Sequence, residues 1–144
     1  MSARVFASMI LLVATVATAS DTKYPSYDEY AMAREDEIAL ARSAAPKSLS
    51  DRATIKVLTR AGYEVAVEGD NGVVCLVMRG WSGVNFAPET HQVAYDAKLR
   101  APICFDPIAA RTILPQEELR ANLGLEGVAP AAIAEELAMA YATG

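Results

Sequence analysis

The sequence predicts an α+β fold, a small antiparallel sheet of three or four strands with an N-terminal helix and C-terminal helices packed on it. Three observations predict it: helical periodicity over residues 27–45, strand patterns within residues 53–78 separated by turn residues, and renewed helical periodicity after residue 107. Because helices and strands occur in separate blocks, this order differs from the strand–helix alternation that builds parallel sheets. We expect one domain over residues 26–144.

The first nineteen residues have the layout of a secretory signal peptide. Arg4 is followed by an uncharged run from Val5 to Ala17, and Ala17-Thr18-Ala19 is a small-x-small cleavage pattern. The run is shorter than the roughly 20 apolar residues of a membrane span, so we expect cleavage after Ala19 rather than an anchor. Residues 20–25 then form a flexible lead, and the exported product is periplasmic or extracellular with no stable membrane span.

The first helix of the domain should begin at a capping box formed by Ser26 and Glu29. Strong helix formers continue from Tyr27 to about Ala45, and Pro46 ends the run. The sequence therefore predicts one continuous helix over this range.

Three strands should follow this helix. Residues 53–59 alternate with Ile55 and Val57 on one face, and residues 63–67 alternate apolar residues with Glu64. The turn residues Gly69 to Gly72 predict a hairpin in which the second and third strands pair. The third, residues 73–78, is continuously apolar and should be central and covered on both faces.

The rest of the chain reads as a long connection, an edge strand and helices. Residues 80–100 lack periodicity, and such long connections are often functional. Pro102 makes residues 102–106 an edge strand. Helices are expected over residues 107–114, 115–123 closed by Gly124, and 130–142 with Ile133, Leu137 and Tyr141 on one stripe.

The two cysteines, Cys75 and Cys104, should form a disulfide if the chain is exported, because disulfides persist in oxidising compartments. Their separation of 29 residues corresponds to roughly 3 to 4 kcal/mol of stabilisation. A zinc site with His91, or a thiolate nucleophile with His91 as base, would need free thiols. An oxidising compartment disfavours the zinc site because the disulfide forms instead, and the apolar neighbours of Cys75 disfavour the thiolate nucleophile.

The charge distribution excludes several partners. The net charge is −5, and it becomes about −6 once Arg4 is removed with the signal. Without a basic patch we expect no nucleic-acid binding and no adhesion to anionic membranes. Adjacent acids are interpreted as complements of helix dipoles rather than as catalytic pairs; they are Asp28-Glu29, Asp36-Glu37, Glu117-Glu118 and Glu135-Glu136.

Several short motifs carry a resemblance to a known group of proteins. They are Gly62-Tyr63-Glu64, Gly69-Asp70-Asn71-Gly72, Cys75-Leu76-Val77-Met78-Arg79-Gly80-Trp81 and Ala101-Pro102-Ile103-Cys104-Phe105. Across roughly residues 36–125 the chain resembles a group of uncharacterised exported bacterial proteins. The resemblance implies an envelope or secreted location and a paired-cysteine domain, and it implies no activity, cofactor or catalytic residue.

The candidate binding surface consists of Arg79, Trp81, His91 and Tyr95, in and beside the long connection. Trp and Arg are enriched in binding hot spots, and the competing interpretation, which is favoured for these two residues, is that Trp81 caps the core and Arg79 covers it. Our leading hypothesis is a non-enzymatic module that binds a partner protein or a small ligand through residues 80–100. One alternative is a secreted hydrolase assembled from distant residues, such as carboxylates or Ser82 with His91; Val84 breaks the hydrolase elbow around Ser82. The other alternative is a structural envelope protein. No cofactor is expected.

Overall fold

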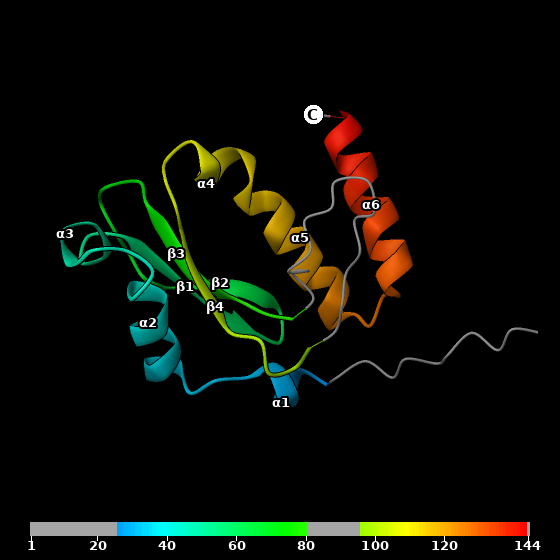
Figure 1. Cartoon of the computed structure of the whole chain (residues 1–144), viewed down its shortest axis with the longest axis horizontal. Coiled ribbons are helices and arrows are strands. Elements are labelled where there is room, and N and C mark those ends of the chain that lie inside the picture. Colours follow the sequence, from blue (N-terminus) through cyan, green and yellow to red (C-terminus); the bar gives the residue numbers. More distant parts are fainter. Residues whose placement is uncertain (1–25, 81–95, 144) are drawn as a thin grey trace, which may run out of the picture.

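The computed structural model describes residues 26–80 and 96–143, and within them the chain has the predicted α+β architecture. A four-stranded sheet has the order β2-β1-β3-β4 (Figure 1). The strands are β1 Thr54–Thr59, β2 Gly62–Val67, β3 Val74–Met78 and β4 Ala101–Phe105. The helices are α1 Tyr27–Tyr30, α2 Arg34–Arg42, α3 Lys47–Ser50, α4 Ala109–Thr112, α5 Leu114–Leu125 and α6 Pro130–Thr143. The expected signal peptide and lead lie outside the described residues.

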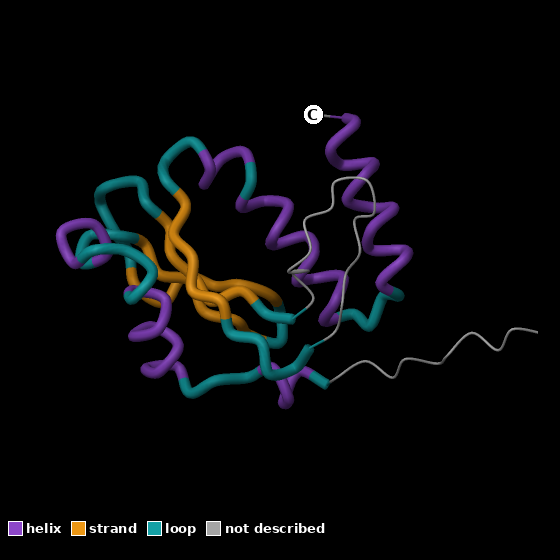
Figure 2. The backbone as a smooth tube through the Cα atoms, viewed as in Figure 1, coloured by secondary structure: helices purple, strands orange, loops and turns teal. Residues whose placement is uncertain are grey.

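The helices cover both faces of the sheet (Figure 2). Helix α2 packs on one face against β1, β3 and β4, while α5 lies on the other face against β2 and is flanked by α6. The α2 side buries a cluster of Ala41, Ala53, Ile55, Cys75 and Val77. On the α5 side two clusters are buried, Leu76, Phe105 and Leu114 in one, and Tyr30, Leu58, Ala121, Ile133 and Leu137 in the other.

Strand β3 is central and buried, as predicted, but the expected hairpin between the second and third strands is wrong. Strand β2 pairs only with β1, and β3 pairs with β1 in parallel and with β4 antiparallel. The sheet is therefore mixed rather than fully antiparallel. The register of β2 against β1 shifts between Ile55 and Lys56, and Val65 on the expected inner face of β2 is 43% exposed.

The turn residues 69–72 failed as a hairpin signal because they bond to the start of β1 and to α3. The backbone N–H of Gly69 donates to the Thr54 hydroxyl (3.1 Å), and a Cβ at Gly69 would lie 2.2 Å from the Thr54 nitrogen. The amide of Asn71 donates to the Leu49 carbonyl (2.9 Å). These contacts carry the chain across the end of β1, so that β3 joins on its far side.

The expected helix over residues 27–45 is interrupted. The capping box is present, since the Glu29 carboxylate accepts from the Ser26 N–H at 3.0 Å. The helix stops after Tyr30, because Ala31 and Ala33 are extended with ψ of 151° and 135°. It resumes as α2.

The C-terminal helices are present with different ends. Gly124 lies buried inside α5, and Gly127 (φ 75°) follows the helix in the left-handed conformation instead. In α6, Ile133 and Leu137 are buried as predicted, whereas Tyr141 is 47% exposed. Across residues 26–80 and 96–143, no helix has the length and apolar character that crossing a membrane requires.

Candidate functional site

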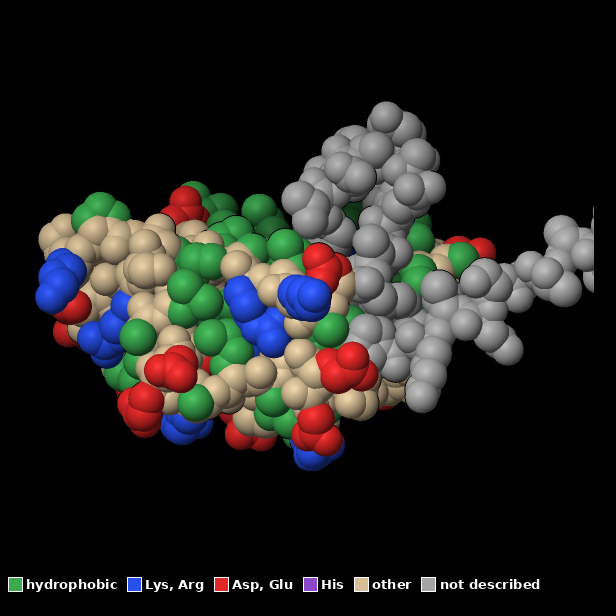
Figure 3. Space-filling model, turned by 60° about the horizontal axis from the view of Figure 1, so that its bottom comes forward, with side chains coloured by type: hydrophobic (Ala, Val, Ile, Leu, Met, Phe, Trp, Pro, Cys, Tyr) green, Lys and Arg blue, Asp and Glu red, His purple; other side chains and the backbone are tan. Residues whose placement is uncertain are grey.

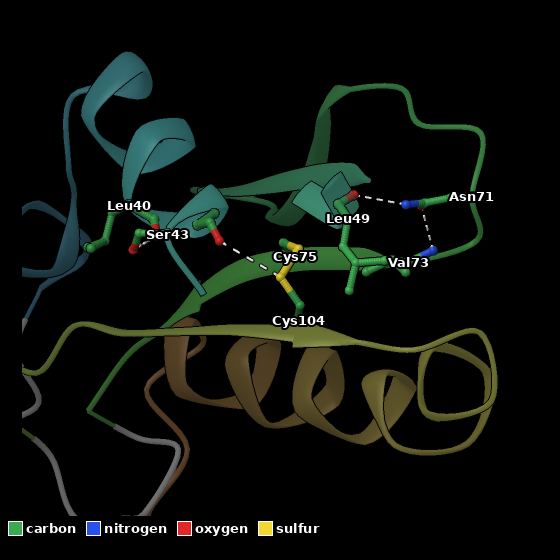
Figure 4. The surroundings of a disulfide bond; sticks show 8 residues. Leu40, Ser43, Leu49, Asn71, Val73, Cys75 and Cys104 are labelled. Atoms are coloured by element: carbon green, nitrogen blue, oxygen red, sulfur yellow. Dashed lines mark hydrogen bonds between the residues drawn. A yellow bond between two sulfur atoms is a disulfide. The ribbon is translucent and has the colours of Figure 1, made fainter. Parts of the chain in front are cut away.

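The disulfide joins the two strands that lead into and out of the long connection. Cys75 in β3 and Cys104 in β4 stand directly opposite each other, with their Cα atoms 4.1 Å apart (Figure 4). This is the close-approach geometry of an antiparallel pair that shares no ladder hydrogen bond. Both cysteines of the chain are used, so the thiol and zinc sites with His91 have no free sulfur in this state.

The bond is packed between the sheet and α2 (Figure 4). Cys75 is fully buried, and the Cys104 sulfur lies 3.9 Å from the Ala41 carbonyl oxygen. Because a disulfide sulfur carries no proton, this is a packing contact rather than a hydrogen bond. Disulfides form and persist mainly in oxidising compartments.

Arg79 lies directly after β3 and is fully buried, with 0% exposure. Its guanidinium Nη2 is 2.8 Å from a carboxylate oxygen of Glu37, which is also buried. The other nitrogens donate to backbone carbonyls, Nε to Tyr30 (2.8 Å) and Nη1 to Val77 (2.6 Å). The second Glu37 oxygen accepts from the Leu58 N–H at 2.9 Å. Such additional hydrogen bonds offset part of the cost of removing a buried ion pair from water.

Arg100 supplies a second anchor and explains the helix break. Its Nη2 donates to the carbonyls of Glu29 (3.2 Å) and Ala31 (3.5 Å), and its Nη1 to those of Ala97 and Leu99. A helix continuing through residues 31–33 would direct these carbonyls into its own hydrogen bonds. Burial, followed by the nearby positive charge of Arg79, lowers the pKa of Arg100.

Two tyrosines complete the polar interior. The Tyr63 hydroxyl donates to the Val77 carbonyl at 2.7 Å, so this carbonyl accepts from both Tyr63 and Arg79. Burial raises the pKa of Tyr63. Burial, with the nearby charges of Glu29 and Asp96, raises the pKa of Tyr30 to about 12. Neither phenol is positioned as a base near neutral pH.

A second buried ion pair lies within α5. Nη1 of Arg120 is 2.6 and 2.7 Å from the two carboxylate oxygens of Glu117, and both residues are buried. Beside it, Glu118 forms an ion pair with Lys56 of β1. Interpreting the adjacent acids only as dipole complements therefore missed Glu37 and Glu117. The available signal was position, since each lies on the buried stripe of its helix, Glu37 with Ala41 and Glu117 with Ala121.

Gly80 and Asp96, the described residues on either side of residues 81–95, are in contact. A Cβ built on Gly80 would lie 1.8 Å from the Asp96 carbonyl oxygen, so the two backbones touch and only glycine fits. Trp81, His91 and Tyr95 lie outside the described residues. Arg79, the fourth residue of the predicted surface, is buried in the interior beneath Gly80 and is therefore not exposed for binding.

On the face turned forward in Figure 3, basic and acidic side chains of the described residues are interspersed. Among residues 26–80 and 96–143, no three His, Cys, Asp or Glu side chains converge as metal ligands. Comparison with family models, curated proteins and solved structures found no match.

Proposed function

We propose that the chain is an exported, disulfide-stabilised binding module, whose rigid frame presents the stretch between Gly80 and Asp96 to a partner protein or a small ligand. The observation that carries the proposal is the meeting of Gly80 and Asp96 on a frame held by buried polar anchors. Binding residues are commonly placed on loops that a rigid scaffold positions.

The frame supports this role because both ends of the stretch are fixed. Arg79 precedes it with an ion pair and two carbonyl contacts, and Arg100 follows it with four carbonyl contacts. The Cys75–Cys104 bond joins β3 and β4, the strands that precede and follow the same stretch. Such a frame reduces the conformational entropy that a binding segment loses when it engages a partner.

The composition of the stretch supports binding over catalysis. It contains Trp81 and Tyr95, and aromatic residues dominate binding hot spots. The buried carboxylates Glu37 and Glu117 are instead neutralised by arginines. Neither serves as a free acid or base for a hydrolase.

Export is part of the proposal. The signal-like residues 1–19 and the disulfide point to the periplasm or the exterior. The intact mass of the natural protein tests it: a product that retains residues 1–19 and carries two free thiols would contradict it.

A deletion isolates the binding segment, because its ends already touch. Residues 81–95 are replaced by a short Gly-Ser linker, and this variant, Trp81→Ala and the full chain are used to capture partners from the native envelope. We expect a specific partner to be captured by the full chain alone, with little change in melting temperature among the three proteins.

The matched control is Ile108→Ala, which removes a side chain 65% exposed outside this stretch. It should capture as the full chain does. Identical captures by the full chain and the deletion variant would overturn the proposal and favour a structural envelope role.

A further inference from the structure

We propose that the outer edge of strand β2 pairs with the same edge of a second copy of this chain, so that the protein forms a weak two-fold dimer. In the part of the chain that the structure describes, the sheet has two edge strands, β2 and β4. An unpaired edge presents backbone N–H and C=O groups to which another strand can bond. This dimer concerns the sheet and is independent of the proposed binding through the stretch between Gly80 and Asp96.

The N–H and C=O groups of Tyr63 and Val65 point to the open side of β2. Thr54 in β1 donates its N–H to the residue before β3, and backbone groups alternate in direction along a strand, so Val57 bonds toward β2. Glu64 stands opposite Val57 and therefore bonds back to β1. Its neighbours Tyr63 and Val65 then direct their backbone groups outward. Val65 is 43% exposed and Glu64 is also exposed, so this part of the edge is accessible.

The edge of β4 is less suited to pairing. Cys104 shares no ladder hydrogen bond with Cys75 opposite it, so Cys104 and its alternate neighbour Pro102 face the open side of β4. Proline has no N–H to donate, and prolines protect sheet edges from pairing. Of the two edges, β2 is therefore the one that can accept a strand.

Arg34 and Glu64 supply opposite charges at the β2 edge. From the start of α2, Arg34 donates to the Ala66 carbonyl at 3.4 Å. Glu64 lies on the α2 side of the sheet, because it is opposite Val57, which alternates with Ile55 in the cluster beneath α2. Both side chains are exposed, and neither forms an ion pair within the described part of the chain.

A two-fold axis through Val65 brings these charges together. Identical edges related by such an axis pair antiparallel, so Val65 stands opposite Val65 of the second copy and the two exchange N–H···O=C bonds. In this register Glu64 lies opposite Ala66 of the second copy, beside Arg34 of that copy. Two intermolecular ion pairs form, and the exposed Val65 side chains cover each other. A pairing centred on Glu64 would instead place two carboxylates directly opposite each other, which is unfavourable.

Sedimentation equilibrium and hydrogen exchange test the dimer in the natural protein. Over about a hundredfold range of concentration, the mass should rise from that of one chain toward that of two. Exchange of the Val65 amide should slow as the dimer forms, whereas the Glu64 amide, which bonds to β1, should change little. A protein that stays monomeric would overturn the proposal and leave the edge to a strand of a different protein. A dimer in which Val65 exchange is unaffected would overturn it too.

Substitutions test the two ion pairs. Glu64→Gln removes both and should weaken dimerisation by roughly three- to tenfold. The matched control Glu136→Gln removes an exposed acid on α6 and should leave dimerisation unchanged. Arg34→Glu should also weaken it, and the charge exchange Arg34→Glu/Glu64→Arg should restore it. Tighter dimerisation of Glu64→Gln would overturn the proposed pairing, because it would show that the two carboxylates oppose each other.

Val65→Pro tests the backbone contact. It removes an outward N–H and no bond to β1, so the monomer should stay folded while dimerisation is lost. Circular dichroism and the melting temperature check the fold of the variant. A folded Val65→Pro protein that dimerises as the natural chain does would contradict the pairing of the two edges. Where this variant does not fold, Glu64→Gln and its control decide.

Discussion

Arg79 and Glu37 form an ion pair at 2.8 Å in which the two side chains are 0% and 1% exposed. The pair joins the end of β3 to α2, and Arg79 also bonds to the last residue of α1. The end of β3 is thereby fixed to α1 and α2, which lie more than 35 residues before it in the sequence, directly beneath Gly80. The position of Gly80 thus depends on a charge pair in the protein interior.

Removing one partner of this pair should be strongly destabilising. Glu37→Ala leaves the Arg79 charge uncompensated in the interior, and breaking such a pair costs about 3 to 5 kcal/mol. Urea denaturation at pH 7 measures the free energy of unfolding. Replacing both partners by apolar residues, in Glu37→Leu/Arg79→Met, should cost less than the sum of the single substitutions.

The control for this prediction is the exposed pair between Arg52 and Asp70. Arg52→Ala should leave the free energy of unfolding essentially unchanged, because exposed ion pairs contribute little. Equal effects of Glu37→Ala and Arg52→Ala would contradict a structural role for the buried pair.

The disulfide should contribute roughly 3 to 4 kcal/mol, as expected for a ring closed over 29 residues. The Cys75→Ala/Cys104→Ala variant should therefore unfold at lower urea concentration than the oxidised protein. Dithiothreitol should destabilise the natural chain and leave the variant unaffected. An equal response of both proteins to the reductant would indicate that the bond contributes nothing.

Gly80→Ala tests the contact at the base of the long connection. The new Cβ would lie 1.8 Å from the Asp96 carbonyl oxygen, so one of the two backbones must move. Overpacking of this kind costs typically about 1 to 3 kcal/mol, seen as a lower melting temperature. An unchanged melting temperature would mean that Gly80 and Asp96 do not touch.

The sequence predicted the features that depend on local pattern. The capping box at Ser26, the alternation in β1, the burial of β3 and the Cys75–Cys104 pairing were all predicted. The pairing of β2 was not predicted, because the turn signal at residues 69–72 indicates only that the chain changes direction. It does not report which strand the chain joins next.

The candidate site was less accessible to sequence analysis, because its contacts are long-range. Arg79 and Glu37 are separated by 42 positions, and the helix break that receives Arg79 and Arg100 has no helix-breaking residue. Tertiary hydrogen bonds to carbonyls override the helix propensity of Ala31 and Ala33 there. Glu37 was missed, although its position four residues before Ala41 places it on the buried side of α2.

Tyr30 predicts a loss of stability at high pH. Burial and the charges of Glu29 and Asp96 raise its pKa from 10.0 to about 12 in the folded protein. Between these values the unfolded chain has released the phenolic proton and the folded chain retains it, so stability falls as the pH rises. The contribution of Tyr30 should be complete below pH 10 and lost on approaching pH 12. Urea midpoints measured across this range should fall less steeply in Tyr30→Phe than in the natural chain. Parallel curves for the two proteins would show that Tyr30 ionises no later when folded than when unfolded.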